Sequence, residues 1–255
     1  INALHASTFA AFERDQFTYS NRNIRQAIYS PDTRYLASVG NEGTLILESL
    51  EDPNPPESLS IGGTRLFDCA FSPDAQKLAI SGSKGLIKII RIPNLEIDTT
   101  IDCGNENVIT LEYSPDGQFL ASGGYDDTVR VWRTSNWQQI AQYRHNGNVW
   151  DVAFSPNGRY LASAAADSLV QIYDLSKPEV SPGKLLYPSK VYGMAYDHSG
   201  NRIAAGYLDG TIIIWNTLSG TIKLKLFNGH PNAVTDVEFS LNGDSLFSSD
   251  SRGNI

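Results

Sequence analysis

The chain has 255 residues, a formal net charge of -8 and two cysteines. The acidic balance argues against a nucleic-acid-binding surface that covers the whole molecule. Cys69 and Cys103 are too few for a disulfide framework and indicate a reducing compartment. Because no run of about 18 apolar residues occurs, we expect no membrane span and a cytoplasmic location.

The first sixteen residues differ from the rest of the chain. Six residues recur there at helical spacing: Ile1, Leu4, His5, Thr8, Phe9 and Phe12. Two interpretations stay open. Residues 1–16 are a helical linker from an upstream domain, or the stretch from Phe9 to Tyr19 includes a strand that completes the last of the units described below. We favour a short helix followed by a strand near Gln16 to Ser20.

From Asn23 onward, one unit of about 42 residues is repeated six times. Each copy has a short apolar strand, a Ser-Pro-Asp-Gly-like turn, a Leu-Ala-Ser-like strand, an Asp-Gly-like turn and an alternating strand. The first turn begins at Ser30, Ser72, Ser114, Ser155, Asp197 and Ser240. Such a period indicates one supersecondary unit that is copied and stacked.

The third unit shows the strands most clearly. Alternation at period two and turn residues predict four antiparallel strands, at Val108–Tyr113, Phe119–Gly123, Thr128–Trp132 and Ile140–Tyr143. Such a small sheet is not stable alone, and nothing in the unit repeats at 3.6 residues. Sheets that stack around an axis cover one another, so the sequence predicts an all-β propeller of four-stranded antiparallel blades.

The predicted propeller covers residues 17–255. Its blades are expected at approximately 17–48, 58–92, 98–132, 138–174, 184–216 and 222–255. The last unit is incomplete, because the sequence stops where the next strand should begin. We therefore expect the chain to be part of a longer protein.

A second set of residues recurs with the strands: a His before the first strand, a Ser on the second, an Asp in the second turn and a Trp closing the third. The fourth unit has His145, Ser163, Asp167 and Tyr173 in this register. The other units keep parts of the set: Ser122, Asp126 and Trp132 in the third, Asp209 and Trp215 in the fifth, and His230 and Ser248 in the sixth, where Arg252 stands at the Asp position. This pattern resembles the WD-repeat (β-transducin-like repeat) β-propeller family.

The resemblance implies a full ring of seven blades and a structural role for this set. Ser, His and Asp together also suggest a hydrolytic triad. A catalytic set needs one copy in a cleft, whereas this one recurs with members missing. We therefore interpret it as a buried hydrogen-bond network.

The resemblance also implies a binding face. The upper face is formed by the loop that enters each first strand and by the second turn. WD-repeat proteins expose there the residues seven and five positions before the first-turn Ser, and the residue preceding the Asp. In this sequence the predicted partner-binding residues are Asn23, Arg25, Arg65, Phe67, Asn107, Tyr125, Asn148, Trp150, Lys190, Tyr192 and Leu208.

Arginines and large aromatic residues dominate binding energy at interfaces, so cations interleaved with aromatic residues favour a binding role for this face. The alternative is that Trp150 and Tyr192 only fill the funnel between blades.

The predicted function is a non-catalytic scaffold or sensor that binds a protein or peptide carrying acidic residues. The start of the chain is similar to the helical linkers that precede WD-repeat arrays in signal-transducing nucleotidases. This resemblance implies a multidomain signalling protein. We expect no cofactor, no metal ion, no small-molecule substrate and no nucleic acid. The competing hypothesis is a propeller accessory to a hydrolase or peptidase. Asp68, Asp151 and Asp236 occupy one equivalent place in their units, which indicates architecture and not catalysis.

Overall fold

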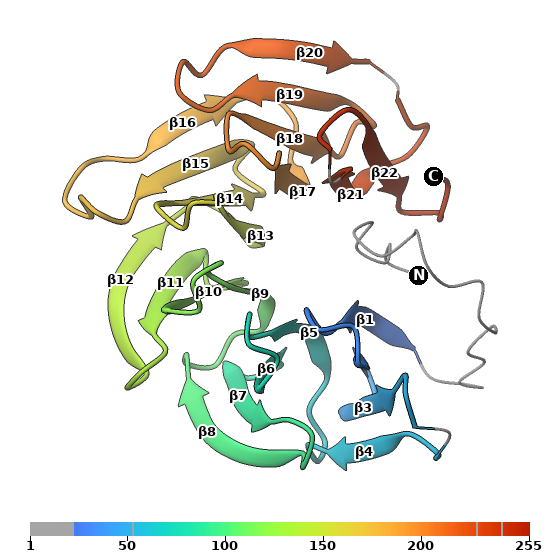
Figure 1. Cartoon of the computed structure of the whole chain (residues 1–255). Coiled ribbons are helices and arrows are strands. Elements are labelled where there is room, and N and C mark those ends of the chain that lie inside the picture. The colour runs from blue at the N-terminus through green and yellow to red at the C-terminus, as the bar shows by residue number, and fades with distance from the viewer. Residues whose placement is uncertain (1–22, 53, 228, 241) are drawn as a thin grey trace.

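The computed structural model describes residues 23–52, 54–227, 229–240 and 242–255. Every regular element in these ranges is a β-strand, and six antiparallel sheets follow one another around a common centre (Figure 1). No described element is an apolar helix long enough to span a bilayer. The expected helix over 1–16 and the expected strand near Gln16 to Ser20 lie outside the described residues.

The sheets form in chain order, and we number them as blades one to six. Five have four strands and the sixth has two. The strands are β1 (Ile24–Tyr29), β2 (Tyr35–Gly40), β3 (Thr44–Ser49), β4 (Glu57–Ser60), β5 (Leu66–Phe71), β6 (Lys77–Gly82), β7 (Leu86–Arg91), β8 (Glu96–Asp102), β9 (Val108–Tyr113), β10 (Phe119–Gly124), β11 (Thr128–Arg133), β12 (Gln138–Arg144), β13 (Val149–Phe154), β14 (Tyr160–Ala165), β15 (Leu169–Asp174), β16 (Gly183–Leu186), β17 (Val191–Tyr196), β18 (Arg202–Tyr207), β19 (Ile212–Asn216), β20 (Ile222–Leu226), β21 (Val234–Phe239) and β22 (Leu246–Asp250).

The first strand of each blade lies nearest the centre, and the fourth strand lies on the outside (Figure 1). Neighbouring inner strands contact one another in the order β1, β5, β9, β13, β17 and β21. This arrangement confirms the predicted all-β propeller of antiparallel blades. A seventh blade stays a prediction.

The outer strands belong to different blades than the approximate ranges implied. Those ranges grouped the strand at 138–144 with the blade that follows it, but β12 pairs with β11 of blade three. The same holds for β4, β8, β16 and β20, each of which pairs with the strand before it. The physical reason is proximity, because a connection of four to eight residues returns each fourth strand antiparallel along the third and satisfies its backbone groups.

The first turn of each blade is held by its own side chains. Ser114 Oγ donates to Asp116 Oδ1 at 2.6 Å and accepts from the Phe119 amide at 2.9 Å. Gly117 has a φ of 70°, which a residue with a Cβ rarely adopts. A Cβ there would lie 3.5 Å from Pro73 of the preceding blade, so the turns of adjacent blades pack closely on the lower face, opposite the upper one.

Side chains fill the spaces between neighbouring sheets. One such cluster joins Ala70, Ala79 and Ile87 of blade two to Leu111 and Trp132 of blade three, all buried. Burial on both faces explains why the strands are rich in apolar residues, and it makes each blade dependent on its neighbours.

Carboxylates of the inner strands connect adjacent blades. Asp68 Oδ2 accepts the Leu111 amide of the next blade at 2.7 Å, and Asp151 Oδ2 accepts the Met194 amide at 2.8 Å. Glu112 accepts the Phe154 amide in the same way. We call these contacts the inter-blade hydrogen bonds. They give the inner-strand carboxylates an architectural role, as the shared position in the repeat predicted.

Candidate binding site on the upper face

A cavity of 680 Å³ occupies the centre of the molecule between the inner strands. At its upper end it is lined by one residue from each of five blades, always five positions before the first-turn residue. These residues are Phe67, Ile109, Trp150, Tyr192 and Thr235.

A β-bulge places these side chains. The pairing of each inner strand with the second strand shifts at this position in all six blades, so that the residue is left without a cross-strand partner. Bulges bend the strand and redirect the side chain of the extra residue. The fold therefore presents Arg25, Phe67, Ile109, Trp150, Tyr192 and Thr235 at the same level.

Three of the aromatic side chains form a connected row across blades three to five. The Trp150 ring centroid lies 5.1 Å from that of Tyr192 and 5.6 Å from that of Tyr125, which approaches edge-on. Tyr125 is exposed, while Trp150 and Tyr192 are half-buried. The buried Nε1 of Trp150 has no hydrogen-bond partner among the described residues. The row packs within the funnel, and the exposed ring of Tyr125 presents an aromatic surface at one end of it.

Arg25 and Phe67 form a second group on blades one and two. The guanidinium carbon of Arg25 lies 5.9 Å from the Phe67 ring centroid, and its Nε donates to Asn41 Oδ1 at 3.0 Å. Arg65 and Lys190 are exposed, and within the described ranges neither forms an ion pair. The upper face therefore carries cations that have no acidic partner of their own.

The structure also explains how the two upper loops meet. In each blade, the carbonyl of the residue seven positions before the first turn accepts the amide of the residue at the start of the second turn. Tyr125 donates to Asn107 at 2.9 Å, and Leu208 donates to Lys190 at 2.9 Å. The carbonyls of Asn23, Arg65 and Asn148 accept in the same way. All eleven predicted partner-binding residues thus lie at the same end of the blades. Seven are in these linked loops, and Arg25, Phe67, Trp150 and Tyr192 are at the start of the inner strands.

The His145 set lies at the edge of this face in blade four. Nδ1 of His145 lies 3.0 Å from Asp167 Oδ2, and Nε2 lies 2.6 Å from Ser163 Oγ. Ser163 Oγ is in turn 2.9 Å from the Tyr173 hydroxyl. Burial lowers the pKa of His145, although Asp167 opposes this shift. The structure brings all four predicted members together in a buried chain of hydrogen bonds.

A family model described as the IFT122 first beta-propeller matches residues 65–255. The chain belongs to this family of WD-repeat β-propellers. A relative from Homo sapiens, the "U3 small nucleolar RNA-associated protein 4 homolog", is 34% identical over 68 residues. The match covers 27% of this chain and 10% of that protein, so the chain spans a small part of its relative's length.

Other blades of this WD-repeat propeller keep the network only in part. In blade three, Asp126 pairs with Arg130 at 2.6 Å, while Ser122 and Trp132 are buried. In blade five, the Tyr187 hydroxyl donates to Asp209 at 3.0 Å. These polar groups find local partners where the histidine is absent.

Three residues of these networks were not found from the sequence. In blade four, Gln171 Nε2 lies 3.1 Å from Nδ1 of His145. Trp215 Nε1 donates to the hydroxyl of Tyr207 at 3.4 Å, and Tyr207 is fully buried. In blade six, His230 Nε2 lies 2.7 Å from Ser248 Oγ, and Nδ1 lies 3.9 Å from Asp250. Asp250 stands two residues before Arg252, so reading the repeat register alone could not find it.

The described part of the WD-repeat propeller contains no group of three His, Cys, Asp or Glu residues placed to hold a metal ion. Both cysteines are free thiols, and burial raises the pKa of Cys69 well above its usual range.

Proposed function

We propose that the chain is a protein-interaction module that binds a peptide or protein segment across the upper mouth of the central cavity. Domains of the WD-repeat propeller family typically act as scaffolds for protein interactions. The observation that carries the proposal is the bulge in every inner strand, which directs Phe67, Trp150 and Tyr192 to one level around the cavity.

The bound segment carries acidic residues. Arg65 on blade two and Lys190 on blade five are exposed on the upper face, and carboxylates of a bound segment would form ion pairs that no described residue supplies to either cation. Charge-assisted hydrogen bonds to arginine are stronger than neutral ones, so such residues contribute to both orientation and affinity.

A peptide-display library tests this proposal. The wild-type protein should select a family of peptides that carry acidic residues. The double variant Arg65→Ala/Trp150→Ala should no longer capture these peptides, while its melting temperature stays nearly unchanged. Truncation of such residues costs about 2 kcal/mol or more each. A control, Arg133→Ala/Leu218→Ala, removes one exposed cation and one exposed apolar side chain from the lower face. Normal capture by the Arg65→Ala/Trp150→Ala variant would refute the site.

We also propose a cytoplasmic location and a place in a multidomain signalling protein. The signalling role rests on the resemblance of the first residues to helical linkers, and the location on composition. The matched human protein is named for association with U3 small nucleolar RNA, so a tagged full-length protein that concentrates in nucleoli would overturn the location.

A further inference from the structure

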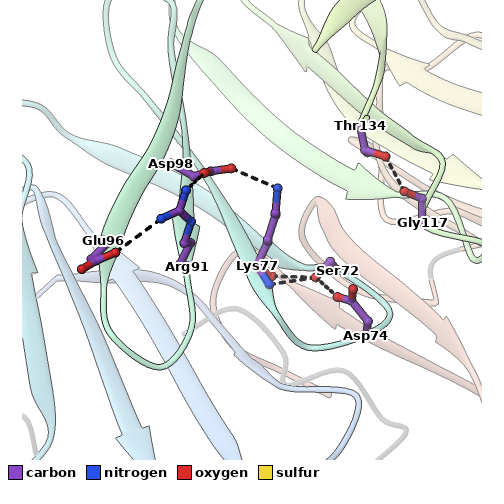
Figure 2. A network of polar contacts seen from close by, with 8 residues as sticks. All are labelled: Ser72, Asp74, Lys77, Arg91, Glu96, Asp98, Gly117 and Thr134. Atoms are coloured by element: carbon purple, nitrogen blue, oxygen red, sulfur yellow. Dashed lines mark hydrogen bonds and ion pairs between the residues drawn. The ribbon is translucent and has the colours of Figure 1, made fainter. Parts of the chain in front are cut away.

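A second pocket lies on the lower face, between blades two and three. It has a volume of 250 Å³, and it is formed at the opposite ends of the strands from the upper-face residues. Its walls come from the first turns of both blades and from the turn between β11 and β12: Ser72, Pro73, Asp74, Lys77, Tyr113, Asp116, Gly117, Thr134 and Trp137. Figure 2 shows the polar contacts around it.

The Tyr113 side chain is more than nine-tenths buried, with 7% of its surface exposed. Its hydroxyl has no hydrogen-bond partner among the described residues. Burial raises the pKa of Tyr113, and the carboxylates of Asp74 and Asp98 raise it further. The phenol therefore stays protonated, and a buried hydroxyl without a partner is costly unless something in the pocket pairs with it.

Two carboxylates stand at the rim. Asp74 Oδ1 accepts from Ser72 Oγ at 2.6 Å and from the Gln76 amide at 3.0 Å. Asp116 Oδ1 does the same with Ser114 and the Gln118 amide. In the described part of the chain, the second oxygen of each carboxylate forms no hydrogen bond or ion pair. The Ser72 hydroxyl holds the pKa of Asp74 below its usual range, so this group is ionised at neutral pH.

The cations nearby are already paired. Figure 2 shows the ammonium group of Lys77 directed to Asp98, at 3.0 Å, where Arg91 also binds. Arg91 reaches Glu96 at 3.5 Å. Lys77 and Arg91 thus pair with Asp98 and Glu96. The charge of Lys77 also helps to lower the pKa of Asp74, but in the described part of the chain neither Asp74 nor Asp116 forms an ion pair of its own. Lys77 also lies 5.5 Å from the Trp137 ring centroid, so the indole already accepts a cation.

We propose that this pocket binds the guanidinium group of an arginine side chain from a protein partner. A guanidinium is flat, carries five N–H donors, pairs with carboxylates and stacks on aromatic rings. The pocket offers acceptors at Asp74, Asp116 and Tyr113 and an aromatic wall at Trp137. The net charge of -8 also favours a basic partner. This site lies on a different face from the proposed function and does not depend on it.

The chain itself shows which substitutions the turn tolerates. Asn157 and Asn242 occupy the position of Asp74 in blades four and six and accept the same serine hydroxyl, at 2.7 and 2.6 Å. Phe71, Phe154 and Phe239 occupy the position of Tyr113 in blades two, four and six. Asp74→Asn, Asp116→Asn and Tyr113→Phe should therefore fold normally.

The test is a titration of the whole chain with N-acetyl-arginine N-methylamide, followed by NMR at the indole N–H of Trp137. The neutral citrulline analogue, which has nearly the same shape, is the matched probe. We expect a saturable shift with the arginine probe in the millimolar range and none with citrulline. Asp74→Asn/Asp116→Asn should weaken binding roughly tenfold and Tyr113→Phe about threefold.

Asp32→Asn is the matched control, because Asp32 has the same turn role in blade one and lies outside the pocket. It should leave the affinity unchanged. Equal binding of the citrulline probe, or unchanged affinity in Asp74→Asn/Asp116→Asn, would overturn the proposal. So would a saturable arginine shift at another tryptophan with none at Trp137.

Discussion

His145 shows how a single residue couples this fold to pH. Its imidazole is buried between Asp167 and Ser163, and burial lowers its pKa. In the unfolded chain the same imidazole binds a proton near its ordinary pKa of about 6.5. The unfolded state therefore binds more protons below that pH, and the free energy of unfolding falls as the pH decreases.

We predict that the wild type loses more stability than His145→Gln when the pH is lowered from about 7 to about 5. Urea unfolding at several pH values measures the difference. His198→Gln is the control, because His198 is exposed in a turn and should leave the slope as in the wild type. Parallel pH profiles for wild type and His145→Gln would contradict the prediction.

Individual residues could be predicted where the repeat register fixes their neighbours. His145, Ser163, Asp167 and Tyr173 stand at the expected offsets, and the structure brings them into contact. Asp250 could not be predicted, because it reaches His230 from outside the register. The upper-face residues lie on the linked loops and at the start of the inner strands, and their binding role stays a prediction.

At the scale of elements, the second turn of blade two depends on a glycine. Gly85 has a φ of 67°, and a Cβ there would lie 2.0 Å from the carbonyl oxygen of Gly104. Gly62 has a φ of 62°, but a Cβ there would meet no atom within 4 Å. The two glycines share the left-handed conformation and differ in the space around them.

We predict that Gly62→Ala lowers the free energy of unfolding by about 1 kcal/mol, since only the backbone conformation is penalised. Gly85→Ala adds a backbone clash and should lower it by about 3 kcal/mol or more. Chemical denaturation of both variants gives the comparison. Equal effects would show that the loop holding Gly104 moves aside.

The strands of each unit could be predicted because alternation and turn residues mark where they begin and end. The third unit correctly predicted Ile140–Tyr143 as its fourth strand, since β12 pairs with β11. The approximate blade ranges placed that strand with the following blade, because a period does not say where a blade begins. The bulges also leave no sequence signal. Arg25, Ile109 and Thr235 occupy the bulge position in three blades and aromatic residues occupy it in the others, so only the backbone pairing shows that each is the extra residue.

For the whole molecule, the inter-blade hydrogen bonds connect units that otherwise meet through apolar side chains. Burial raises the pKa of Asp151 well above its usual range, and the charges of Asp236 and Asp68 raise it further, although the Met194 amide opposes the shift. The Asp151 oxygen that accepts the Met194 amide therefore contributes more to stability than the negative charge of the carboxylate does.

We predict that Asp151→Asn, which keeps an acceptor for the Met194 amide and removes the charge, leaves the free energy of unfolding unchanged or higher at neutral pH. Asp151→Ala leaves that amide unpaired and should lower it by about 1 to 3 kcal/mol. Equilibrium unfolding in urea distinguishes the two. Similar losses in both variants would show that the carboxylate itself is required.

The repeat period alone predicted the propeller, because sheets of this size need neighbours on both sides. The inter-blade hydrogen bonds make the two sides of a blade different, because the side-chain acceptor and the backbone donor belong to different blades. Each one runs from a side chain on one flank of a blade to a backbone group on the flank of the next, as from Asp68 to Leu111 and from Asp151 to Met194. A duplicated copy of blade two or blade four would thus carry both the aspartate and the equivalent backbone amide, and could dock against its own copy. The gene of such a protein could therefore gain whole blades by duplication without any change in the residues already present.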